Sequence, residues 1–303
     1  METHRPGCNP LVMLFRICAI ALALALPASA AANPAVSAPS NPDWTQPFPP
    51  FHIVGNIYYV GSKDLAAYLI TTPQGDILIN SNLETSVPQI KTSIEQLGFH
   101  LGDVKILLIS HAHFDHAAGS AQLLKLTGAR YLVMDADASV IETGGRTDFH
   151  YFDSKDMYFP PAKVNRVLHD GDQVKLGNTV LVAHRTGGHT KGCTTWTMDV
   201  SDQGKTYHVV IVGSPNVNPG YKLVKNAKYP NIAADYQATF RTLKGLPCDI
   251  FLGAHGSYFD MAAKIARRDR GERQPFLDPA GYRTYIAERE LAFQSELRKQ
   301  EGH

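Results

Sequence analysis

Residues 106–119 read Ile-Leu-Leu-Ile-Ser-His-Ala-His-Phe-Asp-His-Ala-Ala-Gly, and this stretch decides the fold. The apolar run that enters it is of strand length and typical of a strand buried on both faces. A compact group of imidazoles and one carboxylate follows, at His111, His113, Asp115 and His116. This mix of nitrogen and oxygen donors suits Zn²⁺. Residues two apart point the same way in an extended backbone, so His111 and His113 are expected to share one ion. Asp115 and His116 follow the turn and are expected to reach a second ion.

Two later histidines stand in settings that resemble each other. His189 lies in Gly-Gly-His-Thr at residues 187–190, and His255 lies in Gly-Ala-His-Gly at residues 253–256. Each follows a predicted strand, and the flanking glycines let the backbone approach a ligand closely. Alone, either residue would more often be a structural histidine. Beside the His-rich cluster, both become expected metal ligands.

The remaining sequence predicts strands and helices in a repeated order. Strands are expected at residues 53–60, 67–70, 75–80, 104–109, 131–134, 164–168, 174–176, 179–184, 194–198, 208–212 and 250–252. Helical periodicity predicts helices at residues 87–97, 117–126, 233–243 and 279–299. Strands dominate the start of each half and helices its end, which indicates an α/β protein with helices covering a pair of packed sheets.

Residues 141–161 fit neither pattern. They contain Gly144-Gly145, several aromatic residues and Pro160-Pro161. A loop this long in a compact domain is usually functional or disordered. We expect a flap over the active site, with a simple surface excursion as the alternative.

The N-terminus predicts secretion. Arg5 precedes an apolar run at residues 11–26, and Arg16 interrupts it. The run is followed by Pro-Ala-Ser-Ala at residues 27–30, whose small residues are typical of a cleavage site. This is the pattern of a secretory signal peptide at residues 1–30, with a buried helix or a membrane anchor as alternatives. The mature part, residues 31–303, is then expected to be a single periplasmic domain whose first residues, 31–50, form an extended lead-in.

Composition excludes some partners. The 29 basic and 28 acidic residues give a net charge of +1, which provides no electrostatic footprint for nucleic acid or an acidic membrane surface. Cys8 and Cys18 fall in the predicted signal peptide, so the mature chain keeps Cys193 and Cys248. We expect these two thiols to be unpaired, although an oxidising compartment would allow a disulfide.

The metal motifs resemble the metallo-β-lactamase superfamily, and within it the subclass B3 dizinc β-lactamases. The similarity runs from about residue 50 to the end, and its motifs lie at residues 110–119, 144–150, 188–196 and 218–221. The resemblance implies an αβ/βα four-layer sandwich, in which two mixed sheets pack face to face with helices outside and the metals lie at the sheet edge. It also implies two Zn²⁺ ions. The first would be bound by His111, His113 and His189, and the second by Asp115, His116 and His255.

The same resemblance implies hydrolysis of the β-lactam amide bond of penicillins, cephalosporins and carbapenems by a metal-bound hydroxide. Asp115 would align the attacking water, and Tyr221 would assist at the developing oxyanion, unless its ring merely packs. Substrate contacts are expected from Ser214, Asn218 and Tyr221.

One absence refines the assignment. Many relatives of this fold, such as glyoxalase II and lactonases, bridge their metals with a further Asp at the end of a late strand. Here the strand at 208–212 is followed by Gly-Ser-Pro-Asn, without an acid. Subclasses B1 and B2 generally have Cys near this place, whereas Ser214 fits B3; the following Pro215-Asn216 departs from the family pattern.

Alternative functions remain open at this level. A lactonase or thioesterase of the same fold would differ in its substrates, and a non-catalytic periplasmic zinc-binding protein would show no turnover. Mixed ligands that leave open coordination argue against a closed structural site. A nuclease is disfavoured by the neutral charge and the signal peptide. We expect a monomer that acts on a small β-lactam, with no nucleic-acid partner and no membrane contact after signal removal.

Overall fold

The computed structural model describes residues 1, 2, 7 and 41–302. Apart from three positions, the predicted signal peptide lies outside the described residues, as does the lead-in up to residue 40. The chain divides by its contacts into Met1–Pro34 and Ala35–His303, and every described helix and strand belongs to the second unit. Among the described residues, no helix combines the length and apolar character that crossing a membrane requires.

The first sheet of this unit has seven strands in sequence order. They are β1 (Phe51–Val54), β2 (Ile57–Tyr59), β3 (Tyr68–Thr72), β4 (Gly75–Ile79), β5 (Val104–Leu108), β6 (Arg130–Met134) and β7 (Arg166–Leu168). Strands β1 to β4 pair antiparallel, and β4 to β7 pair parallel. In β5, residues 106–108 are all buried, so the apolar run Ile-Leu-Leu contacts both faces of the sheet, whereas Lys105 before it is exposed.

The second sheet has five strands in the order β12-β11-β10-β9-β8. They are β8 (Gln173–Leu176), β9 (Thr179–Arg185), β10 (Thr194–Asp202), β11 (Lys205–Val212) and β12 (Ile250–Gly253). Strands β10 and β11 form a long hairpin in which Asp202 pairs with Lys205. The two connecting residues, Gln203 and Gly204, both have positive φ, as the tight turn of a two-residue hairpin requires. β12 adds to β11 in parallel.

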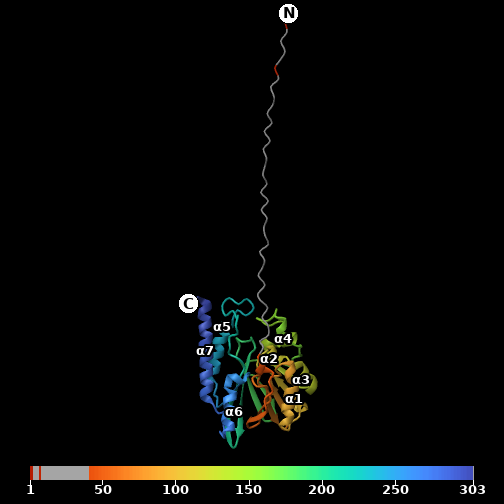
Figure 1. Ribbon diagram of the computed structural model, residues 1–303, viewed down its shortest axis with the longest axis vertical. Coiled ribbons are helices and arrows are strands. Elements are labelled where there is room, and N and C mark those ends of the chain that lie inside the picture. Colours follow the sequence, from red (N-terminus) through yellow and green to blue (C-terminus); the bar gives the residue numbers. More distant parts are fainter. Residues whose placement is uncertain (3–6, 8–40, 303) are drawn as a thin grey trace. The chain divides into compact units, whose positions relative to one another are not determined.

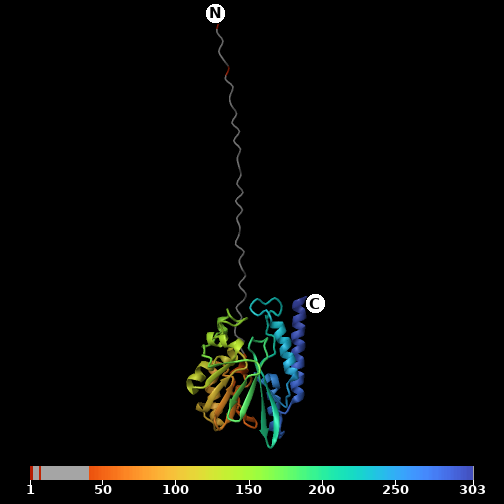
Figure 2. The same cartoon turned by 180° about the vertical axis from the view of Figure 1, so that it is seen from behind.

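Helices cover the outer faces of both sheets, as Figures 1 and 2 show from opposite sides. On the side of the first sheet are α1 (Val87–Gln96), α2 (Phe114–Ala117), α3 (Ser120–Thr127) and α4 (Asp135–Thr143). On the side of the second are α5 (Ile232–Gly245), α6 (Met261–Asp269) and α7 (Pro279–Glu301). The predicted αβ/βα four-layer sandwich is therefore confirmed.

The alternation of side chains along the strands creates two hydrophobic cores. In β4, Ile77 and Ile79 join one core, while Leu78 between them joins the other. The smaller core lies under α1 and α3, and the larger one includes the inner faces of both sheets together with α5 and α7. Period-two alternation in strands places neighbouring residues on opposite faces, so each sheet can serve two layers at once.

Several predicted boundaries change in the structure. The strand expected at 53–60 is two strands, β1 and β2, because Gly55 adopts a positive φ and lets the chain reverse. The helix expected at 117–126 is divided into α2 and α3. Helices α4 and α6 were missed: α4 is short and starts directly after β6, and α6 is rich in charge.

The predicted flap at 141–161 is partly helical, since residues 141–143 belong to α4. The rest is closely packed, with Phe149, Tyr151 and Phe159 buried. Its Tyr151 ring lies 5.2 Å from the His113 ring, so the segment borders the His-rich cluster. Its function as a flap stays a prediction.

Cys193 and Cys248 are both unpaired, as expected. Cys193 is buried and Cys248 is partly buried. Burial raises the pKa of each thiol to about 12, so both stay protonated at neutral pH.

Candidate metal centre

Six predicted ligands follow the ends of three strands. His111 and His113 lie in the loop after β5, and the short helix α2 then carries Asp115 and His116. His189 follows β9, and His255 follows β12. Gly188, next to His189, has a φ of 127°, and a Cβ there would lie 2.6 Å from the Tyr236 ring. Only glycine permits this close approach, as its position beside a predicted ligand indicated.

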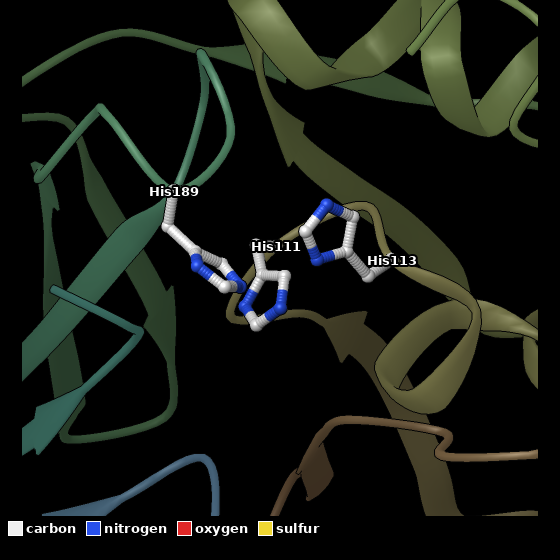
Figure 3. Close-up of side chains that lie close together, drawn as sticks. All are labelled: His111, His113 and His189. Carbon is white, nitrogen blue, oxygen red and sulfur yellow. The ribbon is translucent and has the colours of Figure 1, made fainter. Parts of the chain in front are cut away.

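The first triad consists of His111, His113 and His189, and Figure 3 shows their rings converging from two loops. Ring centroids are 4.8 Å apart for His111 and His113, 4.6 Å for His111 and His189, and 4.7 Å for His113 and His189. One possible ligand atom from each residue lies within 4.8 Å of the other two. All three side chains are buried.

The second triad consists of Asp115, His116 and His255. The Nε2 atoms of His116 and His255 are 3.1 Å apart. Asp115 Oδ2 lies 3.3 Å from the first of these nitrogens and 3.5 Å from the second. The two triads adjoin, because the His111 and His116 rings are only 4.4 Å apart. The structure thus brings together all six residues that the sequence analysis selected.

The donor atoms fit a metal ion. His111 Nε2 is buried and has no hydrogen-bond partner among the described residues, which is costly unless a ligand satisfies it. Burial also lowers the pKa of His111 well below its usual value, that of His113 to about 4, and those of His116 and His189 to about 3. These imidazoles are therefore neutral at neutral pH and offer lone pairs. Buried neutral imidazoles with one carboxylate form a donor set that zinc accepts.

Hydrogen bonds behind the ligands select which ring nitrogen is free. His189 Nδ1 donates to the Asn216 carbonyl at 2.8 Å, which leaves Nε2 as the ligand atom. His255 Nδ1 lies 2.9 Å from Asp64 Oδ2, which likewise leaves Nε2. Asp64 is itself held, since it accepts from Trp44 Nε1 at 3.1 Å and from the Ser257 amide at 2.9 Å. These hydrogen bonds fix the orientation of the His189 and His255 rings.

The second triad also holds charge. Burial opposes protonation of His255, but hydrogen bonds with Asp115 and Asp64 prevail and raise its pKa to about 9. Although burial disfavours its ionised form, Asp115 has a pKa below its usual range because of His116 and His255. A cation bound beside Asp115 and His255 would compete with a proton on His255, because an imidazole ligand must be deprotonated.

A further carboxylate stands behind the first triad. Asp148 Oδ2 is 3.8 Å from His113 Nε2, beyond hydrogen-bond distance. Its other oxygen accepts from the His150 and Tyr151 amides at 2.7 and 2.6 Å. His150 itself belongs to neither triad, and its ring packs against those of Tyr151 and Tyr221.

The predicted substrate residues lie in different settings. Asn218 Nδ2 donates to the Tyr151 hydroxyl at 3.1 Å, beside the first triad. Ser214 is buried, and its hydroxyl lies 3.1 Å from that of Tyr258. Tyr221 is also buried and donates its hydroxyl proton to the His189 carbonyl at 2.7 Å. The roles of these three residues in catalysis and substrate binding stay predictions.

Sequence reasoning missed the carboxylates behind the ligands. Asp64 is 191 positions away from His255, and no local pattern marks it. Asp148 stood within the predicted flap motif but had no assigned role. The signal for it was its place in the motif at residues 144–150, which resembles that of subclass B3.

Comparison with known proteins identifies a family and several solved structures to which this chain is similar. Residues 65–255 match the family model described as the metallo-beta-lactamase superfamily. The native metallo-beta-lactamase from Legionella gormanii is similar, with 56% identity, a TM-score of 0.84, and coverage of 85% of this chain and 98% of that one. A subclass B3 metallo-beta-lactamase of Bradyrhizobium japonicum has 39% identity and a TM-score of 0.80, over 86% of this chain and 98% of that one.

A curated metal-dependent hydrolase from Cupriavidus taiwanensis is similar over a shorter stretch. The two are 34% identical over 119 residues, which are 39% of this chain and 37% of that protein. This match therefore spans little more than a third of the curated relative's length.

Proposed function

Because this chain belongs to the metallo-beta-lactamase superfamily, we propose that it is a dizinc β-lactamase that hydrolyses the amide bond of β-lactam antibiotics. The observation that carries the proposal is the pair of adjoining triads, joined through the 4.4 Å contact of the His111 and His116 rings. The similarity to subclass B3 β-lactamases over almost their whole length supports the substrate class.

The two triads offer ligands for two ions. His111, His113 and His189 would hold one, and Asp115, His116 and His255, whose donor atoms lie 3.1 to 3.5 Å apart, would hold the other. Zinc, if bound there, would lower the pKa of a water ligand to about 7 and would polarise a substrate carbonyl. The protein contributes ring orientation through Asn216 and Asp64, so that the ligand nitrogens need little reorganisation.

Asp115 supplies the only negative charge among the six ligands. Its Oδ2 atom faces His116 and His255, and its other oxygen can accept a hydrogen bond from the attacking water. A carboxylate that aligns the nucleophile restricts its approach to the amide carbon, which lowers the entropic part of the barrier. On the side of the first triad, Asn218 and Tyr151 provide polar groups that can orient the substrate.

The end of β11 favours a lactamase over other hydrolases of this fold. Residues 205–220 contain no Asp or Glu, and Ser214 stands just after the strand. Bridging of two ions by a further carboxylate, as the resemblance implies for lactonases and glyoxalase II, is therefore not available from this segment.

Hydrolysis assays on the zinc-loaded protein test the proposal. A penicillin, a cephalosporin and a carbapenem are compared with a lactone and a thioester, and Asp135→Asn serves as a matched surface control. We expect turnover of β-lactams by both proteins. Turnover of only the lactone or the thioester would assign another hydrolase activity, and tight zinc binding without any turnover would assign a binding protein.

We also propose that the protein acts as a periplasmic monomer after removal of residues 1–30. The basic and apolar N-terminal pattern supports export. Cell fractionation followed by N-terminal sequencing tests this location, and size-exclusion chromatography with light scattering tests the monomer. Retention of the uncleaved chain in the cytoplasm, or a stable dimer, would contradict the respective part.

A further inference from the structure

Asp137 is a buried carboxylate to which the proposed function assigns no role. It lies in the first turn of α4 (Asp135–Thr143) and is 1% exposed. Within residues 41–302, no Lys, Arg or His lies within ion-pair distance of it. Burial raises its pKa to about 6, so it is ionised at neutral pH. Burying a charge without an ion-pair partner is costly unless hydrogen bonds stabilise it, so the groups that contact Asp137 must account for its burial.

The carboxylate accepts three hydrogen bonds from two separate loops. Oδ2 accepts from the Ala112 amide at 2.9 Å and from the Thr190 hydroxyl at 2.7 Å. Oδ1 accepts from the Gly192 amide at 2.8 Å. Ala112 stands between His111 and His113, and Thr190 directly follows His189. One side chain therefore connects both loops that carry the first triad.

The loop after His189 is shaped to reach this carboxylate. A Cβ on Gly192 would lie 2.6 Å from the Asp137 backbone nitrogen and 2.8 Å from its Cγ. Any larger residue would push the loop away from α4, and the hydrogen bond to Oδ1 would be lost. The contact with α4 is thus a close backbone approach and not an incidental surface contact.

Only a carboxylate satisfies all three donors. Both of its oxygens accept, whereas an amide of the same shape would direct an N–H group at one of the donors. A buried donor left facing another donor loses its partner and is repelled. The loops would then shift relative to each other, and with them the imidazoles.

We propose that Asp137 is a positioning residue that fixes His111 and His113 relative to His189 and so sets the affinity and geometry of the first metal site. The inference rests on the metal site of the proposed function, but not on its substrate. Preorganised ligands bind a metal more tightly because the loops lose less freedom on binding.

The test compares Asp137→Asn with Asp135→Asn. Asp135 lies in the same first turn of α4, but it is exposed and contacts His169. Both variants therefore lose one negative charge at the same helix terminus, and only one loses contact with the loops. Metal-free proteins are titrated with Zn²⁺ against a chelator, and Co²⁺-loaded proteins are compared by visible absorption.

We expect Asp137→Asn to weaken the first site by about 10- to 100-fold and to shift the Co²⁺ absorption, whereas Asp135→Asn matches the wild type. Chemical unfolding of the metal-free proteins measures stability separately. Wild-type Zn²⁺ affinity and an unchanged Co²⁺ spectrum in Asp137→Asn would overturn the inference, even if the variant were less stable.

A second pair of variants decides the matter if Asp137→Asn does not fold. Thr190→Val removes one of the three hydrogen bonds with little change in volume, and Thr190→Ser retains the hydroxyl. We expect weaker Zn²⁺ binding in Thr190→Val and recovery in Thr190→Ser; equal affinities would overturn the inference. These measurements use no β-lactam, so a protein that binds zinc as expected but hydrolyses no β-lactam would refute only the proposed function.

Discussion

The two triads are neighbours but differ in how their charge is arranged. The first is built from three imidazoles whose pKa values burial lowers, and the Asp148 carboxylate stays 3.8 Å from His113. The second contains the Asp115 carboxylate, and Asp64 lies 2.9 Å behind His255. The first site therefore depends on the positions of neutral ligands, and the second depends on negative charge. Substitutions that remove charge should separate them.

Removal of both ions should have the largest effect. We expect chelation to abolish hydrolysis and added Zn²⁺ to restore it, because the buried thiols, with pKa values near 12, offer no alternative nucleophile. Activity is measured against the zinc content of each sample. Full β-lactam hydrolysis in a thoroughly demetallated sample would refute the metal mechanism for both triads.

Asp115→Asn should separate the two sites most strongly. It preserves volume but removes the charge of the second triad, while every ligand of the first triad is unchanged. We expect loss of one zinc, retention of the other, and a fall in kcat of roughly a hundredfold or more, which corresponds to about 3 kcal/mol. Metal analysis and steady-state kinetics measure both. Two tightly bound zincs with near wild-type turnover would show that Asp115 is neither ligand nor aligning group.

Asp64→Asn should weaken only the second site, by about 10- to 100-fold in zinc affinity. An amide retains one acceptor for His255, but it no longer stabilises positive charge there. The matched control is Asp43→Asn, which removes a partly exposed carboxylate that pairs with Lys63 at 3.0 Å. Competition titrations give the affinity of each ion. An equal loss in both variants would mean that general surface charge, and not the contact with His255, controls the site.

Asp148→Asn should have the smallest effect. Asn retains an oxygen that accepts from the His150 and Tyr151 amides, and no hydrogen bond to His113 is lost at 3.8 Å. We expect less than about a tenfold change in first-site zinc affinity, because the electrostatic contribution falls with distance. Isothermal titration of the metal-free variant measures it. A loss of zinc affinity as large as that caused by Asp64→Asn at the second site would show that both sites depend on negative charge to the same degree.

Neighbouring residues carried most of the information about ligands and layers. The apolar run of β5 indicated a buried strand, and the next few residues contained four ligands, so their proximity followed from chain connectivity alone. His189 and His255 were identifiable because each stood beside glycine at a strand end. The packed sheets were likewise predicted from local periodicity. Where that periodicity was short or masked by charge, as in α4 and α6, the helices were missed.

The sequence by itself therefore determined which side chains are the expected metal ligands, because their donor chemistry and spacing are properties of short segments. Only the tertiary structure decided which carboxylates support them. Asp64 reaches His255 across 191 positions, and Asp137 reaches Thr190 across 53. Such pairs form when distant segments pack, and a single buried Asp has no spacing or periodicity that distinguishes it beforehand. A hydrogen bond also requires its atoms to lie within a few tenths of an ångström of about 2.9 Å, a precision that only the folded backbone provides.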